Sequence, residues 1–187
     1  MVNSITTICY ASCLVFNRVR YYLLWQPSAE FGDRFVLSKP DRALLITEKH
    51  EELLSFAEEM KLTVAPEEPV VIDFDDFWRH LMHLKNGEPL SKEACRAILN
   101  GWNVMEDFAR TFGIRNDLLS RGEGRAIQKA YENVFYGADV LDSTAPDELL
   151  PTVLTSRETT VVVSFIEGLR KNISKILLRS EKVPAIF

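Results

Sequence analysis

Asp76, His80 and His83 are the residues whose types and spacing best suit chemistry. They form a DxxxHxxH pattern in the stretch EEPVVIDFDDFWRHLMH, which runs from Glu67 to His83. On a helix that turns by about 100° per residue, the three side chains share one narrow stripe. Carboxylate and imidazole groups are typical zinc ligands, so the pattern allows a metal-dependent hydrolase.

Two features of the same helix argue against a metal site. Its apolar side chains gather on another face, so the Asp/His/His stripe is predicted to point mostly toward solvent; these apolar residues are Phe77, Trp78, Leu81 and Leu84. The stripe also lacks the HExxH frame of zinc enzymes, with its built-in general base, and the only other histidine is His50. We therefore favour a protein without metal or other cofactor, and keep Asp76, His80 and His83 as the alternative.

The carboxylates of this stretch suit a docking surface. Residues 48–83 contain three basic and ten acidic side chains, a net charge of −7, whereas the whole chain of 187 residues carries −5. A field of one sign steers encounter with an oppositely charged partner, although such a block is also typical of a plain solvated face. The residues that we predict to bind a partner are Glu67, Glu68, Asp73, Asp75 and Asp76.

Composition and motifs disfavour several other functions. Direct nucleic-acid binding usually needs a basic patch, and this chain is acidic. It contains no GxSxG nucleophile elbow, and the GEGR sequence at Gly122–Arg125 matches no phosphate-binding loop. The three cysteines, Cys9, Cys13 and Cys95, are interpreted as buried thiols in a reducing cytoplasm. We therefore expect a cytoplasmic protein that is not an enzyme.

The elements that position these residues predict an α+β fold, with a small N-terminal antiparallel sheet followed by a mainly helical bundle. Strands are expected at residues 19–25, 35–37 and 43–46. Helices are expected to begin after the N-caps Thr47, Asp73 and Ser91 and to end near residues 62, 85 and 112. A fourth follows the glycine-containing loop Arg121–Gly124, and a fifth covers residues 156–179, where the β-branched run at 159–166 leaves a strand open.

The chain is predicted to form a single domain over residues 1–187, with a strand-rich part at 18–46 and a helical part at 47–187. The apolar run Ile5–Phe16 is shorter than the roughly 20 residues that span a bilayer as a helix, so we expect no membrane contact. This run is either a buried strand or part of an N-terminal extension covering residues 1–17. Clean patterning starts at Arg18, so we expect the folded unit to begin there.

Gly101 interrupts an otherwise strong amphipathic helix. Glycine at such a position costs about 1 kcal/mol relative to alanine, so we expect another helix to approach closely there. Trp102 is predicted to fill the core beside it. Asn103 and Asp107 lie four residues apart on the flank, where they either hydrogen-bond to each other or face a partner.

Two segments resemble the immunity proteins of contact-dependent growth inhibition in bacteria. They are VVIDFDDFWRHLMHL at Val70–Leu84 and LSKEACRAILNGWNVMEDFARTFG at Leu90–Gly113, about a quarter of the chain. The resemblance implies a protein that binds and neutralises a cognate toxin domain, often a basic nuclease. We expect this protein to be a monomer or homodimer. A structural or regulatory subunit of another complex is the remaining alternative.

Overall fold

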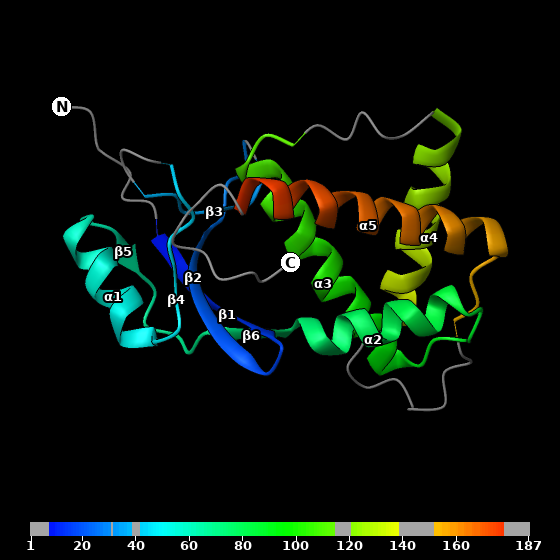
Figure 1. The fold of residues 1–187 in the computed structure, drawn as a ribbon, viewed down its shortest axis with the longest axis horizontal. Helices are drawn as coiled ribbons and strands as arrows, with labels where there is room; N and C mark the ends of the chain where they lie inside the picture. Colours follow the sequence, from blue (N-terminus) through cyan, green and yellow to red (C-terminus); the bar gives the residue numbers. More distant parts are fainter. Residues whose placement is uncertain (1–7, 31, 39–41, 115–120, 139–151, 178–187) are drawn as a thin grey trace.

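The computed structural model describes residues 8–30, 32–38, 42–114, 121–138 and 152–177. Within them, a six-stranded sheet and five α-helices confirm the α+β class. The sheet is mixed rather than antiparallel, because two short strands from beyond residue 60 run parallel to the first strand. Figure 1 shows the sheet and α1 toward one end of the molecule, with α2, α4 and α5 toward the other.

The centre of the sheet is a hairpin of β1 (Ile8–Phe16) and β2 (Val19–Gln26). They pair from Tyr10↔Trp25 to Phe16↔Val19, and the two turn residues, Asn17 and Arg18, have φ values of 50° and 64°. Positive φ at both positions is the requirement of a type I′ turn, whose twist matches that of the strands.

The remaining strands are added on both sides of this hairpin. Two of them pair antiparallel with β2: β3 (Arg34–Phe35) and β4 (Ile46–Thr47). Another two pair parallel with β1: β5 (Thr63–Val64) and β6 (Val70–Asp73). The expectation that the folded unit begins near Arg18 is therefore wrong. β1 is a central strand, and Cys9, Cys13 and Leu14 are each only 1% exposed, so Ile8–Phe16 of the apolar run is a buried strand; residues 1–7 lie outside the described residues.

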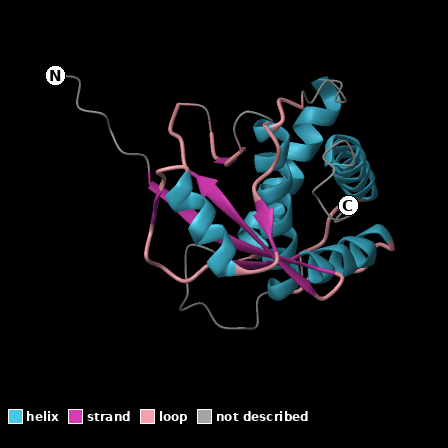
Figure 2. Cartoon of the chain, turned by 60° about the vertical axis from the view of Figure 1, so that its left-hand side comes forward, coloured by secondary structure: helices cyan, strands magenta, loops and turns pink. Residues whose placement is uncertain are grey.

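Helices lie on both faces of the sheet (Figure 2). On one face, α1 (His50–Glu59) buries Leu53 and Ala57 with Cys9, Ala11 and Leu24 of the sheet. The prediction of Thr47 as its N-cap is wrong, because Thr47 belongs to β4 and Lys49 occupies the cap position. Because Ile46 and Thr47 pair with β2, α1 starts only after them, at His50.

On the other face, α2 (Phe74–Lys85) and α3 (Lys92–Thr111) begin at the predicted caps. Asp73 accepts a hydrogen bond from the Asp76 amide at 2.9 Å, and Ser91 accepts one from the Ala94 amide at 3.2 Å. α3 is the central helix of this layer, since it contacts α2, α4, α5, β3 and β6. It ends at Thr111, and Gly113 follows shortly after with a φ of 63°, the left-handed conformation that terminates many helices.

The layer is completed by α4 (Arg121–Gly137) and α5 (Ser156–Leu177). α4 includes Arg121–Gly124, which was predicted to be a loop. The strand alternative at 159–166 is wrong, because these residues are helical and Val162 and Ile166 are 0% exposed. Lys129 of α4 and Glu158 of α5 form an ion pair of 3.0 Å that joins the two helices. The last two residues of the predicted fifth helix, 178 and 179, lie outside the described residues.

Candidate functional site

Asp75, one of the predicted partner-binding carboxylates, closes the turn of the central hairpin. Its Oδ1 accepts from the Asn17 amide and its Oδ2 from the Arg18 amide, each at 2.8 Å. These two amides belong to the residues with positive φ, and no ladder bond is available to them at the turn. Asp75 therefore connects the first turn of α2 to the β1–β2 hairpin and serves the fold directly.

Asp75→Ala is expected to lower the free energy of unfolding by roughly 1–2 kcal/mol, since it removes two hydrogen bonds to a charged acceptor. Asp75→Asn retains one acceptor oxygen and should lose about half as much. Urea titration followed by circular dichroism measures both values. An Asp75→Ala protein as stable as the wild type would show that these two bonds do not hold the turn.

The Asp76, His80 and His83 stripe is only partly assembled. His80 Nε2 lies 3.3 Å from Asp76 Oδ1, and Asp76 also pairs with Arg79. His83 turns its Nδ1 toward Glu88 instead, at 3.5 Å. No group of three or more His, Cys, Asp or Glu side chains in the described part of the chain is arranged to hold a metal ion.

His83 is exposed as predicted, whereas His80 is not on the wet side of the helix: only 18% of its side chain is exposed. Burial lowers the pKa of His80, and the positive charges of Arg79 and His83 lower it further. Phe77 lies in the core, as predicted. Trp78 is half-buried against the core, with the Arg170 guanidinium 4.8 Å from its ring.

Glu67, Glu68 and Asp73 remain exposed, and together with Val70 and Val71 they form what we call the β6 edge surface. β6 pairs with β1 on one side, and no other strand in the described residues pairs with its outer side. Val70 and Val71 are 63% and 54% exposed. An open strand edge with exposed apolar side chains is a template for binding an extended segment.

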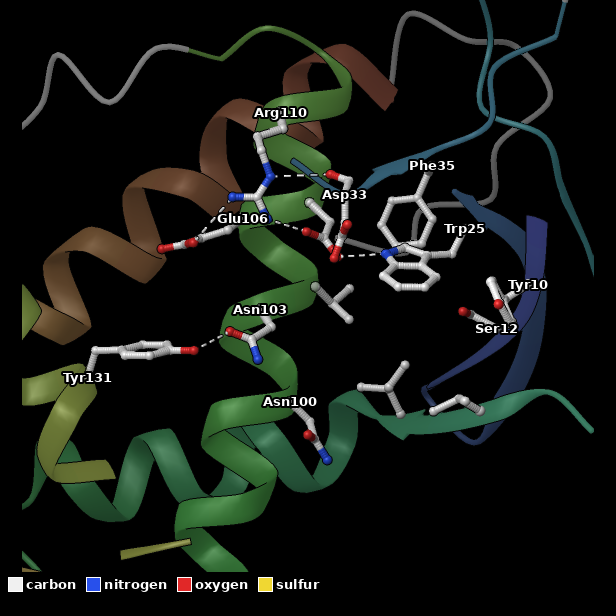
Figure 3. A pocket seen from close by; sticks show the side chains of 14 residues that line it. Tyr10, Ser12, Trp25, Asp33, Phe35, Asn100, Asn103, Glu106, Arg110 and Tyr131 are labelled. Atoms are coloured by element: carbon white, nitrogen blue, oxygen red, sulfur yellow. Dashed lines mark hydrogen bonds and ion pairs between the residues drawn. The ribbon is translucent and has the colours of Figure 1, made fainter. Parts of the chain in front are cut away.

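A cleft of about 540 Å³ opens between the sheet and α3, and Val70 and Ile72 of β6 form part of its wall (Figure 3). The sheet contributes its α3-facing side chains, and α3 contributes the opposite wall. The lining is Tyr10, Ser12, Trp25, Asp33, Phe35, Val70, Ile72, Asn100, Asn103, Val104, Glu106, Asp107, Arg110 and Tyr131. The sequence did not predict this cleft.

Asp107 is the buried charge of the cleft, only 7% exposed. It accepts from Trp25 Nε1 at 3.1 Å and pairs with Arg110. Burial raises the pKa of Asp107, and the hydrogen bonds from Arg110 and Trp25 oppose that rise. Asp107 therefore does not bond to Asn103, which accepts instead from the Tyr131 hydroxyl at 2.9 Å.

No local pattern marked this site. By helical spacing Asp107 falls with Asn100 and Asn103, opposite the apolar stripe of its helix, where a carboxylate is ordinary. Its partner Trp25 lies 82 residues away in sequence, so helical spacing alone did not connect them.

The three cysteines are buried as predicted, at 1% exposure or less. Burial raises the pKa of the Cys9, Cys13 and Cys95 thiols. A thiol with a raised pKa holds little thiolate at neutral pH and is a weak nucleophile.

Comparison with family models, curated proteins and solved structures finds no match to this chain. None of the helices in the described residues is long and apolar enough to cross a membrane.

Proposed function

We propose that this protein is a non-enzymatic inhibitor that binds and neutralises a toxin domain, in the manner of the immunity proteins of contact-dependent growth inhibition. The observation that carries the proposal is the β6 edge surface, where Val70 and Val71 are 63% and 54% exposed among three exposed carboxylates. As neighbours in a strand they point to opposite faces, so the open edge of β6 presents an exposed valine on each face, and exposed apolar side chains beside an unpaired strand edge are typical of protein contact sites. In this proposal the protein works in the cytoplasm, as a monomer or homodimer.

The chemistry of the surface fits a basic partner. A nuclease domain needs a cationic cleft to hold phosphates, and Glu67, Glu68 and Asp73 present carboxylates of the opposite sign. The outer side of β6 adds main-chain donors and acceptors that pair with an extended segment. The opposite charges then raise the association rate, and the main-chain groups and valines of the strand edge lower the dissociation rate.

Two of the five predicted partner-binding carboxylates are used within the fold. Asp75 holds the hairpin turn and Asp76 pairs with Arg79 and His80. These two carboxylates therefore serve the fold, as does Asp73, which caps α2 but stays exposed. The proposed contact narrows to Glu67 and Glu68, with Asp73 beside them.

The direct experiment is co-expression with the toxin domain encoded immediately upstream of this gene. The protein should restore growth and co-purify with the toxin domain, and the purified pair should associate faster at low ionic strength. Failure to protect the cells, or the absence of a toxin domain from the neighbouring genes, would contradict the proposal.

Glu67→Lys combined with Glu68→Lys should slow association by about tenfold at low salt, because electrostatic steering raises on-rates by one to three orders of magnitude. Stopped-flow mixing with the toxin domain measures the rate. The matched control is Glu58→Lys with Glu59→Lys, an equal change of charge on two exposed residues of α1. Equal slowing by both pairs would assign steering to net charge and remove the β6 edge surface from the contact.

A further inference from the structure

Ser12 lines the cleft, and its hydroxyl has no hydrogen-bond partner among the described residues. It lies on the α3-facing side of β1, in the same row as Leu14 and Phe16, and is only 7% exposed. Figure 3 shows its oxygen directed toward the space between β1 and α3, and none of the described residues forms a hydrogen bond with it. Although the residue is largely buried, its hydroxyl borders the open space of the cleft, so Ser12 can donate to or accept from a polar group that enters there.

The cleft carries an excess of carboxylates in its lining. Asp33, Glu106 and Asp107 line it against a single cation, Arg110. With all three acids ionised, the lining has two more negative than positive charges. A cation entering the cleft would therefore find charges of the opposite sign in a partly dehydrated space, where they act more strongly than in water.

The contacts of Arg110 indicate that a guanidinium group fits these acceptors. Its guanidinium pairs with Asp107, lies 3.6 Å from Glu106 Oε2 and donates through Nε to the Asp33 carbonyl at 3.2 Å. Its side chain is nevertheless 39% exposed, so it reaches these groups from the rim. The lining thus already binds one guanidinium and keeps the interior of the cleft open.

Aromatic rings complete the lining. Tyr10 and Trp25 meet edge to face with their centroids 5.7 Å apart, and Phe35 and Tyr131 lie on other sides of the cleft. Flat aromatic faces attract guanidinium groups through cation–π contacts. The cleft thus combines carboxylates, a free hydroxyl and aromatic rings.

We propose that the cleft receives an arginine side chain from the partner, carried on an extended segment that lies along β6. The inference rests on the proposed binding function, because it assigns a chemical feature to that same partner. Val70 connects the two sites, since it belongs to the β6 edge surface and also lines the cleft beside Ser12, its register partner. Glu106 and Asp107 already pair with Arg110 and accept from Trp102 and Trp25 respectively, so an entering guanidinium would share these oxygens, each of which can accept a second hydrogen bond. A planar guanidinium fits carboxylate acceptors better than an ammonium does.

The test is a titration of the isolated protein with N-acetyl-arginine amide, followed by the NMR signal of the Trp25 indole N–H. The signal is assigned by its loss in Trp25→Phe. We expect a saturable shift with a dissociation constant of about 1 mM, as befits a small probe. N-acetyl-citrulline amide has nearly the same shape without the charge and should cause no saturable shift. Equal shifts by both probes would overturn the arginine site.

Substitutions in the lining distinguish a binding site from an inert space. Arg110→Met should tighten binding of the arginine probe by at least about threefold, because it releases carboxylates that Arg110 now occupies. Glu106→Gln should weaken it by a similar factor and can still accept the Trp102 indole hydrogen bond. Glu58→Lys with Glu59→Lys on α1 should leave it unchanged. An Arg110→Met protein that is folded and binds no more tightly would contradict the proposal.

The experiments can contradict either proposal without contradicting the other. If the protein protects cells from the toxin but shows no saturable shift with the arginine probe, the cleft assignment is wrong and the proposed function stands. If the arginine probe binds but the protein gives no protection, the cleft assignment is supported and the proposed function is wrong.

Discussion

Gly101→Ala is expected to lower the free energy of unfolding by about 3 kcal/mol, at the upper end of the usual effect of overpacking. A Cβ atom at this position would lie 2.3 Å from two atoms of the Phe77 ring. That ring cannot easily move, because Phe77 is 0% exposed and its centroid lies 5.5 Å from that of Phe74 and 4.8 Å from that of Trp78. α2 and α3 would have to separate locally.

Thermal and urea unfolding followed by circular dichroism measure this loss. Gly124→Ala is the matched control, because Gly124 is also helical and a Cβ there meets nothing within 4 Å. That variant should gain about 0.5–1 kcal/mol from helix propensity alone. If both substitutions were neutral or stabilising, close approach of the Phe77 ring would not be the reason for glycine at 101.

A chain that begins at Arg18 is expected to lose cooperative unfolding altogether. β1 pairs with β2 from Tyr10 to Phe16, and it is the only described strand that pairs with β5 or β6. Removing it leaves these two strands without a partner and exposes the apolar residues of both cores that pack on it. A loss of this extent exceeds the 5–15 kcal/mol by which a typical domain is stable.

Differential scanning calorimetry distinguishes a missing transition from a lowered one. Leu14→Ala keeps the strand but removes a side chain that is 1% exposed, so it should unfold cooperatively with about 3 kcal/mol less stability. A sharp transition in the chain that begins at Arg18, close to that of the full chain, would show that β1 is dispensable.

Local chemistry made the helices of the second layer predictable. Asp73 and Ser91 supply side-chain acceptors just before apolar residues that repeat at helical spacing, and both act as caps in the structure. Gly101 was correctly interpreted as a point of close approach, and Trp102 as core, since it is 0% exposed. These features depend on residues within a few positions of one another, which is the range over which caps and helical periodicity act.

Strand order was not predictable in the same way. β5 and β6 are short and pair with β1 from more than 50 positions away, and parallel pairing of this kind leaves no turn signal between the partners. The same distance explains the error at Arg18. An isolated apolar run of this length can be a buried strand or part of an N-terminal extension. Only the strands that pair with it on both sides identify it as a central strand of the sheet.

The sequence by itself determined the α+β class, the starts of α2 and α3, the acidic excess of residues 48–83 and the burial of the three cysteines. Tertiary structure alone decided how the carboxylates are used: Asp75 binds the hairpin turn, Asp107 pairs with Trp25, and Glu67 and Glu68 remain exposed. It also produced the cleft around Ser12. The reason is physical, because a carboxylate's role depends on which donors meet it, and those donors come from elements distant in sequence.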